Sequence, residues 1–159
     1  MTATANHELS ITRLIDAPPE VVYRVWTERT GEWWAPRPYT TPVVELDLKP
    51  GGRGLMVMRA PDGTDMPNEG VFLEVARNEK IVFTNAFAAG WIPQDPFMVV
   101  IVTFEPEGSG TRYAARVRHW TAEALKRHEA MGFHEGWGIV AGQLAELAEA
   151  EAKSNPAVA

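Results

Sequence analysis

The chain has 159 residues and a hydrophobic content of 45%, which is enough for one domain with a substantial buried core. Its formal net charge of −6, with no run of Lys and Arg, argues against a nucleic-acid backbone or an anionic membrane as partner. The absence of cysteine excludes disulfides, thiolate nucleophiles and cysteine-ligated metals. There is no signal-like N-terminus and no apolar run of about 18 residues, so we expect a cytoplasmic protein.

A strand and two short helices are predicted at the start of the chain. Residues 9–15 alternate in polarity and are rich in β-branched side chains, which is typical of a strand. The Pro-Pro pair that follows ends this strand, and apolar residues then recur at helical spacing over 19–28. Thr30 is predicted to cap a second, shorter helical turn that carries Trp33 and Trp34.

The middle of the chain has the period of two that indicates strands. Six are predicted, at about residues 44–48, 53–59, 69–75, 80–85, 97–105 and 111–120. Short turns connect them, except for a longer loop over 88–96, so we expect an antiparallel meander. No linker or repeat divides the chain. We therefore expect a single domain over residues 1–159, with its core at about 8–151 and flexible ends at 1–7 and 153–159.

Residues 121–151 are predicted to form one long closing helix, with Gly132, Gly136, Gly138 and Gly142 in its interior. Each interior glycine costs a helix about 0.5–1 kcal/mol relative to alanine, so the missing side chains need a reason. Gly132 and Gly136 are four residues apart and therefore share one face of this helix. Two explanations remain open: close packing of the helix on a sheet, or space beside the helix for a ligand.

Several short motifs occur in an order that is typical of one protein family. They are Ala17-Pro18, Trp33-Trp34-Ala35-Pro36, Asp47 before Pro50-Gly51-Gly52, Gly70, Gly110-Thr111, and Gly136-Trp137 followed by Leu144 and Leu147. This set resembles the START-like (SRPBCC) superfamily and, within it, the activator of Hsp90 ATPase homologue 1-like family. The resemblance implies an α+β helix-grip fold, in which a curved antiparallel sheet of about seven strands wraps around a long C-terminal helix and two short helices follow the first strand. It also implies a cavity between sheet and helix, in a family whose members include ligand binders, resistance proteins and polyketide cyclase-like proteins.

Side chains that could perform catalysis are few. No serine lies at a strand-to-helix elbow, and the Gly51-Gly52 pair precedes a strand, so neither a serine nucleophile nor a phosphate loop is expected. His128 and His134 are six residues apart, on opposite sides of a helix, so we expect no metal site. No motif for a cofactor is present, and we expect none.

His119 and Glu69 are the weak candidates for an acid or base. His119 shares a strand face with Tyr113 and Val117, opposite several arginines, so it is predicted either to face a cavity or to be a core-edge histidine bonded to a backbone carbonyl. Glu69 is predicted on the same strand face as Val71, at the rim of the cavity, where desolvation would raise its pKa. A solvated carboxylate is the alternative.

The expected ligand contacts combine aromatic and methionine side chains, which adapt to irregular shapes, with a few polar groups. They are Trp34, Met56, Met58, Glu69, Phe83, Asn85, Trp91, Met98, His119, Met131, Gly132, Gly136 and Trp137. We therefore predict binding or sequestration of a hydrophobic or aromatic small molecule between the sheet and the C-terminal helix. A polyketide cyclase-like or lyase-like enzyme and a chaperone-associated interaction module are the alternatives. For the oligomeric state, a homodimer stays open.

Overall fold

The computed structural model describes residues 7–154. Its elements in chain order are β1 (Glu8–Ile15), α1 (Pro19–Glu28), α2 (Thr30–Trp33), β2 (Thr40–Leu46), β3 (Arg53–Arg59), β4 (Asp65–Ala76), β5 (Lys80–Thr84), β6 (Phe87–Ala88), β7 (Ile92–Pro93), β8 (Met98–Glu107), β9 (Gly110–His119), α3 (Ala122–Ala130) and α4 (Phe133–Ser154). Seven strands form one antiparallel sheet in the order β1-β9-β8-β5-β4-β3-β2, while β6 and β7 form a separate small hairpin. The expected α+β helix-grip fold and its antiparallel meander are confirmed.

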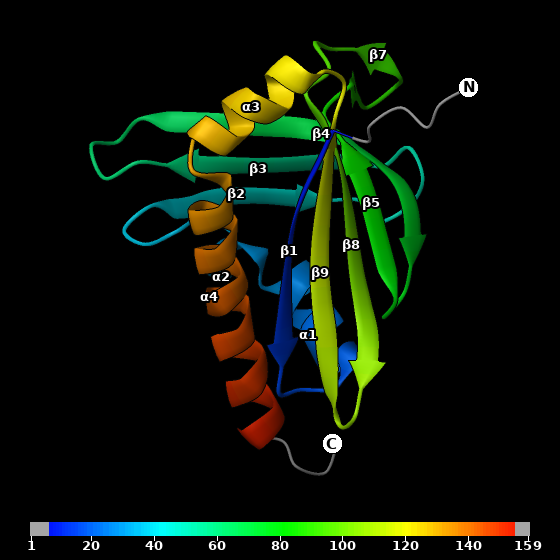
Figure 1. Cartoon of the computed structure of the whole chain (residues 1–159), viewed down its shortest axis with the longest axis vertical. Coiled ribbons are helices and arrows are strands. Elements are labelled where there is room, and N and C mark those ends of the chain that lie inside the picture. Colours follow the sequence, from blue (N-terminus) through cyan, green and yellow to red (C-terminus); the bar gives the residue numbers. More distant parts are fainter. Residues whose placement is uncertain (1–6, 155–159) are drawn as a thin grey trace.

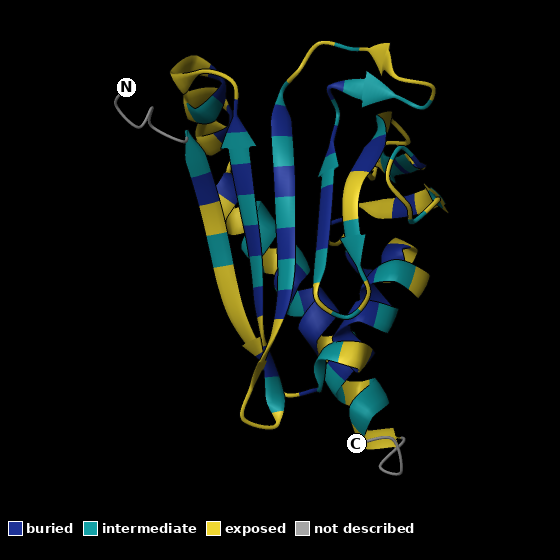
Figure 2. Ribbon diagram, turned by 90° about the vertical axis from the view of Figure 1, so that its right-hand side faces the viewer, coloured by how far each residue is buried: buried dark blue, intermediate teal, exposed yellow. Residues whose placement is uncertain are grey.

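The sheet curves around the long helix α4 (Figure 1). Strands β2, β3 and β4 cross the view, whereas β1, β9 and β8 run down it, and α4 lies along the length of the molecule. Helix α4 contacts α1 and β1, so the helices cover one face of the sheet. Buried and partly buried residues alternate along the central strands (Figure 2), because successive side chains of a strand point to opposite faces.

Strands β8 and β9 show most clearly how the sequence pattern forms the core. Every second residue of β8 from Met98 to Phe104 is buried, as the alternation of apolar residues predicts. On β9 the buried face ends at His119, while Arg116 and Arg118 point outward. The guanidinium groups of these two arginines pair with the carboxylate of Glu8 on β1, at 3.2 and 3.0 Å. The predicted division of β9 into an arginine face and a buried face is therefore confirmed.

The prediction of one continuous closing helix is wrong. Helix α3 ends at Ala130, Gly132 has a φ of +89°, and α4 begins at Phe133. This left-handed conformation strains any residue with a Cβ, so glycine suits the corner between the two helices. The side chain of Thr121 caps the other end of α3 by accepting a hydrogen bond from the N–H of Ala124 at 3.0 Å.

Two further details differ from the sequence prediction. Thr30 does not cap α2, because its hydroxyl donates a hydrogen bond to the Trp26 carbonyl at 2.5 Å and so continues from α1. The loop over 88–96 includes strand β7 of the small hairpin, which was not expected. The expected flexible ends lie outside the described residues, apart from His7 and from Lys153 and Ser154, which belong to α4.

Candidate functional site

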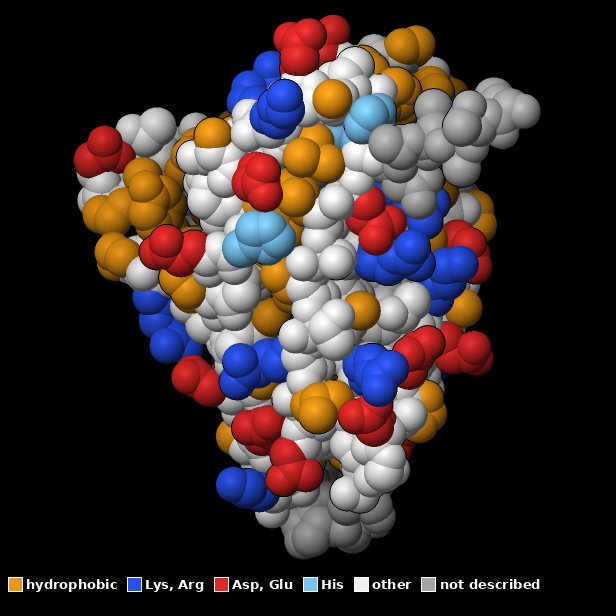
Figure 3. All heavy atoms as spheres, viewed as in Figure 1, with side chains coloured by type: hydrophobic (Ala, Val, Ile, Leu, Met, Phe, Trp, Pro, Cys, Tyr) orange, Lys and Arg blue, Asp and Glu red, His pale blue; other side chains and the backbone are white. Residues whose placement is uncertain are grey.

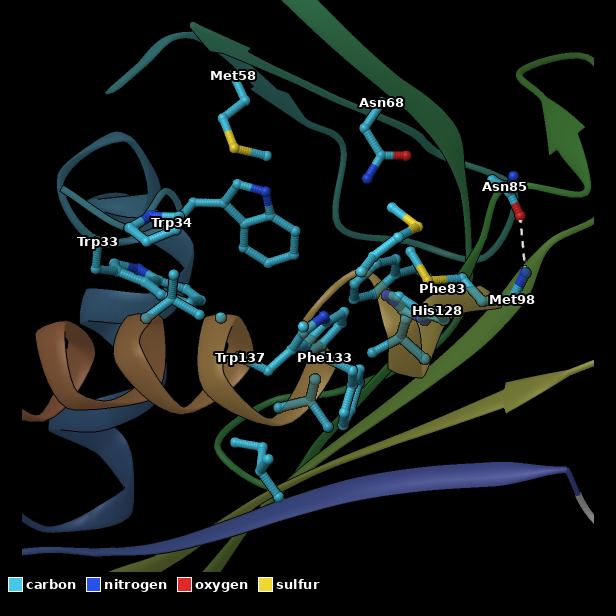
Figure 4. Close-up of a pocket in the computed structure, with 18 of the residues that line it drawn as sticks. Trp33, Trp34, Met58, Asn68, Phe83, Asn85, Met98, His128, Phe133 and Trp137 are labelled. Carbon is cyan, nitrogen blue, oxygen red and sulfur yellow. Dashed lines mark hydrogen bonds between the residues drawn. The ribbon is translucent and has the colours of Figure 1, made fainter. Parts of the chain in front are cut away.

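A cavity of about 400 Å³ lies between the curved sheet and the helices. Apolar and aromatic side chains form most of its wall (Figure 4). The sheet contributes Met58, Phe83 and Met98, and α4 contributes Phe133 and Trp137. Its lining also includes Met131 and Gly132, which are exposed, so the cavity reaches the surface at the corner between α3 and α4.

Gly136 leaves room for the cavity. If this residue carried a Cβ, no atom from other parts of the described chain would lie within 4 Å of it, and Gly136 lines the cavity. Close packing of the helix on the sheet is therefore the wrong explanation for this glycine. At Gly132 the reason is the left-handed φ, and at Gly142 an added Cβ would make only ordinary contact with Arg13, at 3.8 Å.

Aromatic rings form a continuous cluster along one side of the cavity. Trp34 is its centre: its ring centroid lies 5.4 Å from that of Trp33, 6.2 Å from that of Phe83 and 6.3 Å from that of Trp137. Such separations and the tilted or edge-on orientations are those of favourable aromatic pairs. Because each ring contacts several others, the wall is a fixed, preformed surface for another ring.

Besides His128, three polar side chains lie in this apolar wall, and they differ in their hydrogen bonding. The side-chain oxygen Oδ1 of Asn85 accepts hydrogen bonds from the backbone N–H groups of Phe97 and Met98, at 3.0 and 3.1 Å, so it holds the start of β8 in place. The Tyr113 hydroxyl accepts a hydrogen bond from the Trp26 indole at 3.2 Å, and burial raises the pKa of this phenol. The Asn68 amide points into the cavity from β4 and has no hydrogen bond among the described residues.

One lining residue of the cavity, His128, belongs to a bonded pair of histidines. His119 on β9 and His128 on α3 are both buried, and their nitrogens Nε2 and Nδ1 are 2.8 Å apart. The other ring nitrogen of His119, Nδ1, lies 2.9 Å from the carbonyl oxygen of His7. Burial, and then the neighbouring His119, lowers the pKa of His128 to about 4. His128 is therefore neutral at physiological pH, and of the two histidines it is the one that lines the cavity.

Most of the predicted ligand contacts do line this cavity. They are Trp34, Met58, Phe83, Asn85, Met98, Met131, Gly132, Gly136 and Trp137. Met56, Glu69, Trp91 and His119 are not among its lining residues. Met56 is buried beside a second, much smaller cavity under β3 and β4, and His119 is bonded to His7 and His128. The prediction of His119 as a core-edge histidine bonded to a carbonyl is the correct alternative.

The predicted position of Glu69 at the cavity rim is wrong because β4 has a bulge. The register shift between Phe72 and Glu74 puts Phe72 opposite Phe83, so Asn68 rather than Glu69 shares the inner face. The Glu69 carboxylate instead pairs with Arg53 on the outer face at 3.0 Å, as the solvated alternative predicts. A bulge changes which residues face inward, and strict alternation misses it.

Trp91 also lies away from the cavity. Trp91 is 56% exposed, and its ring packs edge-on against that of Phe87, with the ring centroids 5.8 Å apart. A Cβ on Gly51 would come within 3.0 Å of the same ring, so Trp91 covers the turn before β3. This packing holds the β6–β7 hairpin, which also contacts β4, against the turn before β3 and explains the tryptophan without a ligand.

Three polar lining residues, Asn68, Tyr113 and His128, are not among the predicted ligand contacts, nor are apolar ones such as Phe97 and Phe133. On a continuous helix, His128 is a candidate only for a metal site. Basic residues followed by a glycine, as in Arg127, His128 and Gly132, are a signal for the end of a helix, and this signal would have indicated the corner. No comparable sequence signal indicates Asn68, because its direction depends on the bulge.

The cavity wall carries no Asp, Glu, Lys or Arg within residues 7–154. By contrast, acidic and basic side chains are interspersed over the outer face in Figure 3. No cluster of three or more potential metal-ligating His, Cys, Asp or Glu side chains occurs in the described part of the chain. None of the helices described here is long and apolar enough to span a membrane.

The sequence model of one family, described as Activator of Hsp90 ATPase homolog 1-like protein, matches residues 16–149. The chain belongs to this family. Membership in the Activator of Hsp90 ATPase homolog 1-like family agrees with the observed fold. Among proteins with curated descriptions, none matches the chain.

Solved structures of similar proteins share the fold of this family member. A protein from Nitrosomonas europaea is 38% identical, with a TM-score of 0.88 over 94% of this chain and 98% of that one. A protein from Mycobacterium smegmatis is 26% identical, with a TM-score of 0.76 over 89% and 90% of the two chains. The AHSA1-like protein from Aeromonas hydrophila, at 23% identity and a TM-score of 0.71 over 91% and 93%, shows the fold alone.

Proposed function

We propose that the protein binds or sequesters a neutral, hydrophobic small molecule, preferably aromatic, in the cavity between the sheet and α4. The observation that carries the proposal is the cavity of about 400 Å³ with its apolar and aromatic wall. Ligand sites of this kind measure about 300–1,000 Å³ and have few polar groups. The fixed cluster around Trp34 and Trp137 offers ring faces and edges to a flat ligand.

The uncharged side chains of the cavity wall within residues 7–154 favour a neutral ligand. An ionised group loses its hydration when it enters an apolar cavity, and it needs an opposite charge to compensate. The part of the wall formed by residues 7–154 has no such charge. A carboxylate ligand is therefore expected to bind much more weakly than the same ring system without the carboxylate.

Binding is favoured over catalysis by the state of the two predicted acid–base residues. His119 is bonded to His7 and His128, and Glu69 pairs with Arg53 outside the cavity. His128 does line the cavity, but a pKa of about 4 makes it a weak base, and a general base works best with a pKa near the operating pH. Within residues 7–154, the cavity wall thus offers apolar surface for binding, and its one histidine is a weak base.

The experiment is a titration with naphthalene and with 2-naphthoate, followed by isothermal calorimetry and by thermal unfolding. We expect one molecule of naphthalene to bind and to raise the melting temperature, and 2-naphthoate to bind at least about 10-fold more weakly. Trp137→Leu, which alters the cavity wall, should weaken naphthalene binding. Trp91→Leu is the matched control and should leave the affinity unchanged, because Trp91 lies outside the cavity.

Two outcomes would contradict the proposal. One is the absence of naphthalene binding to the folded protein up to the solubility limit of the probe. The other is equal weakening by Trp137→Leu and Trp91→Leu, which would place the bound probe outside the cavity. The cytoplasmic location and the oligomeric state stay predictions that fractionation and light scattering can test.

A further inference from the structure

A chain of two hydrogen bonds connects the His7 carbonyl to the cavity through His119 and His128. The carbonyl oxygen can only accept, so Nδ1 of His119, 2.9 Å away, must carry a proton. When His119 carries only that one ring proton, its Nε2 has a lone pair and accepts. The nitrogen Nδ1 of His128, 2.8 Å from it, must therefore donate.

This proton arrangement determines what His128 offers to the cavity. When Nδ1 carries the proton of a neutral imidazole, Nε2 is an acceptor with a free lone pair. Nδ1 points at His119, which does not line the cavity, and Nε2 lies on the other side of the ring. Nε2 has no hydrogen-bond partner among the described residues.

The surroundings of His128 are the rings of the cavity itself. Its centroid lies 5.0 Å from that of Phe97, 5.1 Å from that of Phe133 and 6.0 Å from that of Trp137, and all three rings line the cavity. The buried acceptor is thus held beside aromatic faces. Burial and His119 keep the ring neutral, which preserves the lone pair at physiological pH.

We infer that the ligand of this cavity is an aromatic compound with a hydroxyl or N–H donor, and that Nε2 of His128 accepts its hydrogen bond. The inference rests on the proposed function and names the class of ligand. Asn68 can both donate and accept, so it adds polarity without selecting a donor. His128 is therefore the group that distinguishes a hydroxyl from its ether. His119 is a positioning residue, because it fixes the proton on Nδ1 of His128.

The test compares 2-naphthol with 2-methoxynaphthalene, which keeps the oxygen but has no donor, by calorimetry at pH 8. We expect the wild type to bind 2-naphthol about 3- to 10-fold more tightly, the range that one hydrogen bond provides. His128→Phe should bind both probes equally, and His128→Gln, which keeps an acceptor oxygen, should restore part of the preference. His134→Phe is the matched control: this histidine is exposed and does not line the cavity, so the preference should persist.

Nitrogen NMR of the histidine rings provides a second, independent readout on the wild type. We expect His128 to be protonated on Nδ1 and unprotonated on Nε2 at pH 8, and 2-naphthol to shift the Nε2 resonance. Protonation on Nε2 would overturn the inference, as would equal affinity of the wild type for the two probes. In those cases the proposed function stands if both probes bind. If neither probe binds, the proposed function and this inference are overturned together.

Discussion

Gly136→Leu tests whether the space beside α4 is the ligand site, because the new side chain would enter that space. A Cβ at this position meets no atom from other parts of the described chain within 4 Å, and the cavity measures about 400 Å³. Four added carbon atoms occupy on the order of 100 Å³, so the substitution removes roughly a quarter of the volume. The reduced cavity is expected to bind naphthalene at least about 10-fold more weakly.

Although Gly136→Leu should weaken ligand binding, it should raise the free energy of unfolding. Replacing a helical glycine by leucine contributes about 0.8–1 kcal/mol through helix propensity. Burial of the leucine in an apolar cavity contributes a further ~1–2 kcal/mol, because burial there is partial. Gly138→Leu is the matched control: its Cβ also meets no described atom, yet Gly138 does not line the cavity, so it should show the propensity gain alone.

Thermal unfolding and naphthalene calorimetry on the two variants measure both effects. At about 2–4 °C per kcal/mol for a chain of this size, the melting temperatures should differ by about 2–8 °C in favour of Gly136→Leu. Equal stability of the two variants would show that the leucine remains in solvent. Naphthalene affinity equal to that of the wild type in Gly136→Leu would show that the glycine does not provide the ligand space.

Three other perturbations have defined outcomes. The pKa of His128 falls from 6.5 in the unfolded chain to about 4 in the fold through burial and the adjacent His119, so its contribution to stability is complete above pH 6.5 and is lost as the pH falls to 4. Between pH 6.5 and pH 4, urea unfolding should show that His128→Phe loses less free energy of unfolding than the wild type, by up to ~3 kcal/mol. An equal loss in the two proteins would contradict the assigned burial effect. Gly132→Ala should destabilise the protein by about 1–2 kcal/mol in thermal unfolding, because Gly132 has a φ of +89°; unchanged stability would mean that the corner relaxes. Asn85→Ala should cost about 1–3 kcal/mol and speed amide exchange at the start of β8, where two backbone N–H groups lose their acceptor; unchanged exchange there would mean that other groups hold the strand.

Local pattern in the sequence was sufficient for the architecture. The alternation along residues 98–104 predicted the buried face of β8. The interior glycines left close packing and ligand space open, and the structure decided for space at Gly136. The motif order indicated the family that the match over residues 16–149 then confirmed. These features depend on periodicity and on residue type, both of which can be read from neighbouring positions.

The polar groups of the site depended on tertiary structure. The bulge in β4 brought Asn68 rather than Glu69 to the inner face, and the corner at Gly132 set the direction of α3. Only the packing of α3 against β9 placed Nδ1 of His128 within 2.8 Å of Nε2 of His119, and so left Nε2 of His128 as the ring nitrogen without a partner among the described residues. The sequence by itself determined the fold and the apolar character of the cavity, because hydrophobic periodicity is local. Tertiary structure decided which polar atoms line that cavity, because a hydrogen bond depends on distances between residues far apart in the chain.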